Sequence, residues 1–119
     1  MKSIALVILI AATAAACAAT PVPADKYARA RAAIRSAEVM KVDQSRTGAL
    51  YLQQAHEAID QANKSLKNGD NERARNLLIR AEADANAAVH MVRAERAKED
   101  MTATLANVRE LKAQLEVTP

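Results

Sequence analysis

The chain has 119 residues and half of them are hydrophobic, yet Tyr27 and Tyr51 are the only aromatic residues and alanine makes up about a quarter of the sequence. β-Sandwiches and barrels need many β-branched and aromatic residues with regular turn signals. Doubly wound α/β enzymes need glycine-rich turns between strand and helix. With two glycines and a formal net charge of +3, the composition excludes both classes, and the length allows one domain at most.

Residues 1–16 have the pattern of a secretory signal peptide. Lys2 provides a positive charge at the start, and residues 4–16 contain no charge and end in small side chains. A helix that spans a bilayer needs about 20 apolar residues, so this run is too short to be one. We therefore expect the segment to be cleaved, and we leave it out of the fold.

Cys17 is the only cysteine, and it directly follows three alanines at 14–16. This segment resembles the lipobox of bacterial lipoproteins, with Ala14 where leucine is usual. The resemblance implies that Cys17 becomes the acylated first residue, carrying fatty acids such as palmitate. The lack of aspartate at positions 18 and 19 points to the outer membrane. The alternative is an ordinary signal peptide with an Ala-x-Ala cleavage site, but acylation would explain an unpaired cysteine in an exported protein.

Residues 17–22 are predicted to be the lipidated cysteine and a short tether, because Pro21 and Pro23 favour extended backbone. The first helix is expected over residues 23–42, where apolar side chains recur at helical spacing. The polar segment 43–48 contains Gly48 and is predicted to connect to the next helix. The apolar stripe of the first helix consists of Tyr27, Ala30, Ile34, Ala37 and Met40.

The second helix ends at Asn68-Gly69, since glycine readily adopts the left-handed conformation that closes a helix. Asp70 is then a favourable N-cap for the third helix. Two helices joined by so short a turn should be antiparallel neighbours. The stripe that identifies the second helix alternates steps of four and three residues: Leu52, Ala55, Ile59, Ala62 and Leu66.

The third helix has no breaker between residues 71 and 117 and is much longer than the second helix. Its second half must project beyond the hairpin, bend back, or pair with another chain. We expect an all-α fold, an antiparallel helical hairpin in a three-helix assembly with a long C-terminal helix after a cleaved signal peptide. The three-helix body would span 23–100 and a helical extension 101–119. The first apolar stripe of the third helix consists of Ala74, Leu77, Leu78, Ala81, Ala85, Ala88 and Val92. The expected core centre is Tyr27, Ile34, Leu52, Ile59, Leu66, Leu77 and Leu78.

A second apolar stripe near the C-terminus is the best functional clue in the sequence. Heptad spacing of this kind is typical of a coiled coil that binds itself or a partner. The alternative is packing within the chain by a bent helix, because fewer than about three heptads are present. The candidate interaction surface consists of Met101, Leu105, Val108, Leu111 and Leu115, with Lys112 as a polar interruption.

The residues that could support chemistry do not assemble into a recognisable site. His56 and Asp60 lie one helical turn apart, but a zinc site needs about four ligands and nothing completes the set. Glu82 and Asp84 point to different helix faces. We therefore expect no catalytic residue, no metal, no cofactor and no small-molecule substrate, and predict that the protein is not an enzyme.

Charges also indicate no nucleic-acid partner. Without Lys2 the mature chain has a net charge of +2, with both signs interspersed. Stacking aromatic residues for single strands are lacking. The basic face of the first helix at Arg29, Arg31 and Arg35 is either a contact for anionic lipid headgroups or a solvated surface.

The helical pattern from Leu52 to Ala81, with Gly69-Asp70 at the turn, resembles the alanine-rich helical lipoproteins of the family called domain of unknown function 4398. The likeness covers residues 24–98. It implies an envelope location and a helical fold, but no established activity.

These observations predict a lipoprotein held by the acyl chains of Cys17 on the periplasmic face of the outer membrane. Its role would be structural or adaptor-like, through helix-mediated contacts with envelope proteins or with itself. The alternative is a soluble periplasmic binding or chaperone-like module that uses an alanine-rich groove.

Overall fold

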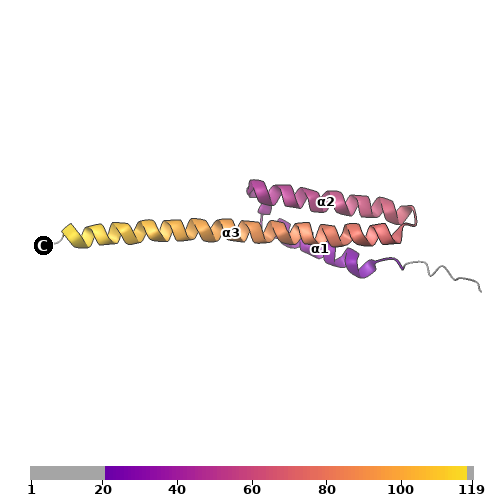
Figure 1. Ribbon diagram of the computed structural model, residues 1–119, viewed down its shortest axis with the longest axis horizontal. Coiled ribbons are helices and arrows are strands. Elements are labelled where there is room, and N and C mark those ends of the chain that lie inside the picture. The colour runs from indigo at the N-terminus through magenta and orange to yellow at the C-terminus, as the bar shows by residue number, and fades with distance from the viewer. Residues whose placement is uncertain (1–20, 118–119) are drawn as a thin grey trace, which may run out of the picture.

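The computed structural model describes residues 21–117, and this part of the chain is almost entirely helical. Helix α1 spans Ala24–Val39, the 3₁₀ turn η1 Val42–Gln44, α2 Arg46–Lys67 and α3 Asn71–Val117 (Figure 1). The predicted all-α fold with three helices and a long C-terminal helix is confirmed. The signal segment and Cys17 lie outside the described residues, so their cleavage and lipidation stay predictions.

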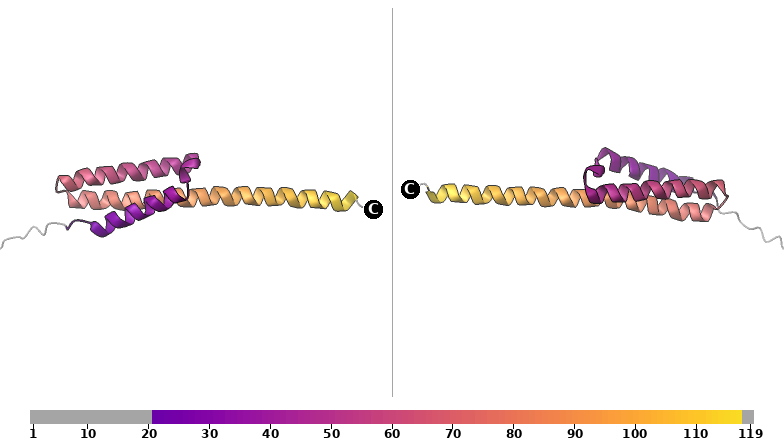
Figure 2. Two further views of the ribbon diagram at one scale, coloured as in Figure 1. Left: turned by 180° about the vertical axis from the view of Figure 1, so that it is seen from behind. Right: turned by 90° about the horizontal axis from the view of Figure 1, so that it is seen from above.

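Helix α3 is the longest of the described helices, and the two shorter helices lie along its first half. Helices α2 and α3 form an antiparallel hairpin, whereas α1 runs in the same direction as α3 (Figures 1 and 2). Contacts at the far end agree with this arrangement, because Arg96 Nη2 donates a hydrogen bond of 3.1 Å to the carbonyl oxygen of Met40, just after α1. The chain therefore enters the bundle beside the hairpin turn, at the end opposite to the C-terminus of α3.

The turn between α2 and α3 forms as the sequence predicts. Gly69 adopts a φ of 76°, in the left-handed region that glycine enters without steric cost. Asp70 then caps α3, since its Oδ1 accepts a hydrogen bond of 3.0 Å from the backbone nitrogen of Arg73. The cap satisfies one of the amide groups that have no partner at a helix start.

The segment between α1 and α2 differs from the predicted polar connection over 43–48. Helix α1 already ends at Val39, and Lys41 turns the chain with a φ of 53°. Val42 is completely buried, and α2 begins at Arg46. Ser45 is the N-cap of α2, because its hydroxyl accepts a hydrogen bond from the backbone nitrogen of Gly48 at 3.2 Å. The polar residues of this segment predict a simple connection, whereas the structure has a turn that packs against the bundle through Val42.

Gly48 lies inside the first turn of α2, and its role is to allow close packing. A Cβ atom at this position would overlap the carbonyl oxygen of Val42 and lie 2.8 Å from Cγ2 of Val92. No side chain fits there without movement of backbone, so Gly48 joins η1, α2 and α3 at one point.

The core is built mainly from alanine, and the predicted core centre is only partly correct. Ile34, Leu52 and Leu78 are buried, but Tyr27, Ile59, Leu66 and Leu77 are only half-buried. Small residues bring helix axes close together, so larger side chains are displaced to the flanks of the contact. Ala58 and Ser65 occupy the α2 seam instead, and the other seam residues are Ala30, Ala37, Ala55, Ala62, Ala74, Ala81, Ala85 and Ala88.

We expect Gly48→Ala to destabilise the protein by about 1–3 kcal/mol, because the added methyl group must displace packed backbone. Helix propensity alone predicts the opposite sign, a gain of about 1 kcal/mol. Urea unfolding followed by circular dichroism measures the difference. The control is Arg46→Ala at the exposed start of the same helix, which should stay within about 0.5 kcal/mol of wild type. A Gly48→Ala protein as stable as wild type would contradict the packing role.

Replacing the cap of α3 should have a smaller effect. Asp70→Ala is expected to lower the free energy of unfolding by about 1 kcal/mol, since the amide of Arg73 loses its acceptor. Asp70→Asn keeps an acceptor at this position and should lose much less. Equal losses in the two variants would show that the capping hydrogen bond is not the cause.

Candidate interaction surface

The second half of α3 has no intrachain covering in the described structure. Val92 is the last buried residue, and every residue from 93 to 117 is exposed. Arg93 and Arg96 still reach the bundle, because Arg93 Nη2 lies 3.8 Å from the sulfur of Met40 and Arg96 Nη2 donates to its carbonyl oxygen, and Glu99 lines a hollow with Lys41 and Arg46. Beyond them α3 continues straight and alone to Val117 (Figure 1).

The predicted apolar surface lies on this free half. Its exposed fractions range from 47% at Val108 to 76% at Leu115. Helix α3 does not bend back within residues 71–117. The alternative prediction, a bent helix that packs against its own bundle, is therefore wrong. Interaction with a partner stays a prediction for Met101, Leu105, Val108, Leu111 and Leu115.

This surface points away from the side of α3 that the bundle covers. Met101 follows the buried Val92 by nine residues, which is about two and a half turns at 3.6 residues per turn. The half turn places Met101 on the opposite side of the helix. A partner on the apolar surface would therefore not compete with α1 or α2 for the same face.

The exposed face continues upstream along the back of the bundle. We call this set the outer stripe, and its positions alternate steps of four and three residues. Thr104 fits such an apolar position, because its hydroxyl donates a hydrogen bond of 2.8 Å to the carbonyl oxygen of Asp100, which satisfies the polar group locally. Leu105 flanks this set. The outer stripe consists of His90, Ala94, Ala97, Met101, Thr104, Val108, Leu111 and Leu115, all exposed.

Sequence reasoning missed the upstream half of the outer stripe. Ala94 and Ala97 are small, and His90 is polar, so none of them attracts notice as a hydrophobic anchor. The signal that indicates them is the regular alternation of four- and three-residue steps from His90 to Leu115. This register avoids Lys112, whereas the register through Met101, Leu105 and Val108 places Lys112 in the seam.

The charges around the free half of α3 nearly balance. Residues 98–117 contain three basic and four acidic side chains. An interfacial membrane helix normally carries lysine and arginine in excess on its polar face. The balance here favours a protein surface as the partner of this half.

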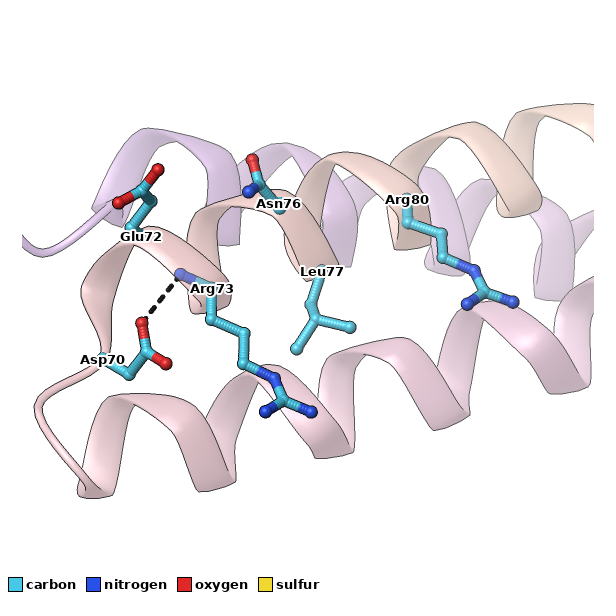
Figure 3. A pocket seen from close by; sticks show the side chains of 6 residues that line it. All are labelled: Asp70, Glu72, Arg73, Asn76, Leu77 and Arg80. Atoms are coloured by element: carbon cyan, nitrogen blue, oxygen red, sulfur yellow. Dashed lines mark hydrogen bonds between the residues drawn. The ribbon is translucent and has the colours of Figure 1, made fainter.

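The hairpin end has a shallow pocket beside the turn between α2 and α3 (Figure 3). Its charged groups already have local roles: Asp70 caps α3, and Arg80 Nε lies 3.4 Å from Oδ2 of the half-buried Asp84. In Figure 3, Arg73 and Arg80 both extend over α2. The other lining residues are Glu72, Asn76 and Leu77. The pocket is open, and the carboxylate of Asp70 is already engaged in capping α3, so the lining shows no arrangement for catalysis.

The histidine that sequence reasoning considered with Asp60 has a different neighbour. His56 Nε2 lies 3.3 Å from Glu38 Oε1, so the pair joins α2 to α1 at the exposed surface. Among residues 21–117, no cluster of three or more histidine, cysteine or acidic side chains could hold a metal ion. Within the same range, no helix has both the length and the apolar character to cross a membrane.

The basic residues of α1 remain at the surface. The guanidinium carbon of Arg31 lies 5.9 Å from the centre of the Tyr27 ring, a distance at which a cation is attracted to an aromatic face. Arg29 and Arg35 are exposed. This face is compatible with either a solvated surface or contact with anionic headgroups.

Comparison with known proteins identifies the family. No curated protein and no solved structure matches the chain. The domain of unknown function DUF4398 matches residues 25–104, which include α1, α2, the hairpin turn and the first part of α3. Most of the chain lies in this match, and the resemblance that the helical pattern and Gly69-Asp70 indicate is confirmed. The chain belongs to the DUF4398 family.

Proposed function

We propose that this protein is a lipoprotein of the outer membrane, facing the periplasm, that acts as a structural or adaptor element of the cell envelope. The proposal joins two features: the acylation pattern at Cys17 and the uncovered apolar side of α3. The outer stripe is the observation that carries the proposal, because a helix of this length with large exposed apolar side chains is suited to binding another protein.

The positions of the two ends support this role. The chain enters α1 beside the hairpin turn, where Pro21, Lys26 and Arg75 line a common surface. The C-terminal end of α3 lies at the opposite end of the molecule (Figure 2). From Arg75 to Val117 the helix rises about 63 Å at 1.5 Å per residue. An anchor on Cys17 would therefore hold the bundle near the bilayer and leave the free half of α3 to reach partners.

The second candidate is a soluble periplasmic module that binds ligands in an alanine-rich groove. The packing favours the adaptor role, because alanines on all three helices are fully buried against one another. Their side chains fill the seam and leave little space for a ligand there. Fractionation separates the two roles, since a soluble module leaves the membrane fraction without detergent.

The anchor is testable by metabolic labelling with an azido fatty acid. We expect the wild-type chain to incorporate the label and Cys17→Ala to lose it completely, because Cys17 is the only thiol in the chain. In-gel fluorescence after coupling to a dye measures incorporation. An unlabelled wild-type chain, or equal labelling of the two chains, would refute lipidation.

The adaptor surface is testable by a photocrosslinking residue placed on α3 in cells. We expect crosslinks from Leu111, on the outer stripe, and few from Ala113, which lies about 160° away around the same helix. Immunoblotting and mass spectrometry identify the products. The two sites are only two residues apart in the sequence, so equal yields would mean that the stripe has no preferred contact.

A further inference from the structure

We propose that the outer stripe binds a second copy of this chain as an antiparallel coiled coil. This inference goes beyond the proposed function, because it names the partner and its orientation and does not depend on Cys17. It rests on the distribution of side-chain size and charge along residues 90–115 of α3, of which only Val92 is buried against the bundle.

The first argument is a gradient of size along the stripe. Its upstream part has Ala94 and Ala97, and its downstream part has Val108, Leu111 and Leu115. Parallel pairing in register would place alanine on alanine at one end and leucine on leucine at the other. Axes prefer 8–10 Å separations that depend on the contacting side chains, so parallel helices would have to diverge along the seam.

Antiparallel pairing removes this mismatch, because the inner layers then combine a small residue with a larger one, while His90 meets the partner's Leu115 at each end of the overlap. Ala94 meets the partner's Leu111, and Ala97 meets the partner's Val108. Met101 meets the partner's Thr104. The same pairs recur on the other side of the two-fold axis, so the separation of the helices stays nearly constant over about 39 Å of overlap.

The second argument is charge at the flanks of the seam. In a parallel coil, the positions that flank the core bring Arg93 beside the partner's Lys98, a repulsive pair that occurs twice. In the antiparallel coil, Asp100 lies beside the partner's Asn107, and Lys98 lies beside the partner's Leu105. No two like charges face each other, and the lysine stem covers the leucine.

The symmetric arrangement also uses Leu105, which the outer stripe itself leaves at its edge. It would be covered by the partner's Lys98 rather than remain half exposed. The bundles would lie at the two far ends of the pair, since the overlap leaves residues before His90 outside it. The start of α3 in one copy would be about 95 Å from that in the other.

Site-specific disulfides test both partner and orientation in the full chain. We would co-express Ala97→Cys and Val108→Cys chains with different tags in the oxidising periplasm. The antiparallel coil predicts a mixed disulfide between the two variants and little disulfide within either one, since each new thiol meets a different position of its partner. Tagged chains with no added cysteine report any background from Cys17.

Leu111→Glu in both chains should lower the yield of the mixed disulfide about tenfold or more, because a carboxylate would be buried against the partner's Ala94. Ala113→Glu on the opposite face is the matched control and should leave the yield unchanged. Disulfides within Ala97→Cys or within Val108→Cys would mean a parallel pair and would overturn the proposal. So would the absence of any product between copies, or products only with other proteins.

The same experiment in a Cys17→Ala background separates this inference from the proposed anchor. The pairing surface does not include Cys17, so the mixed disulfide should form there as well. Loss of fatty-acid labelling with the mixed disulfide retained would refute the anchor alone. A labelled chain that gives no mixed disulfide would refute the pairing alone.

Discussion

Close packing of helices through alanine is the constraint on which the whole structure depends. Alanine side chains in all three helices are fully buried, and they let the backbones approach one another closely. Each contributes little apolar area, since burial is worth about 25 cal/mol per Å². The stability of the bundle therefore depends on the length of the helix contacts and on how closely the helices fit, rather than on a few large residues. The tight contact of Gly48 with Val42 and Val92 is the strictest instance of that fit.

This packing explains why α3 has two different halves. The two shorter helices offer enough length to cover α3 only as far as Val92. Beyond that point the sequence changes its apolar side from the inner face to the outer face and exchanges alanine for larger residues. A helix that merely needed to remain soluble would not carry six large exposed apolar residues between positions 93 and 117. The change of face is therefore best understood as the boundary between a folding surface and a binding surface.

The sequence predicts the elements well where a local signal determines them. Gly69 and Asp70 each act within one turn, and both have the predicted role. Tertiary packing determines the rest. The local sequence predicts that Gly48 is a loop residue, because its contact with Val92 is remote in sequence. The sequence indicates only the downstream part of the outer stripe, since alanine has no obvious hydrophobic signature. Lipidation of Cys17 depends on another molecule, so the packing of the helices does not determine it.

Helix α3 runs without a break from the bundle to Val117. The number of residues between the bundle and the free half therefore determines the direction in which the outer stripe faces. Each inserted residue would rotate the far half by about 100° relative to the bundle. Two extra residues after Arg96 would turn the outer stripe toward the side of the bundle, whereas seven would nearly restore its direction. Evolution can thus lengthen the free half in steps of about seven residues, but single insertions or deletions would change which way it faces.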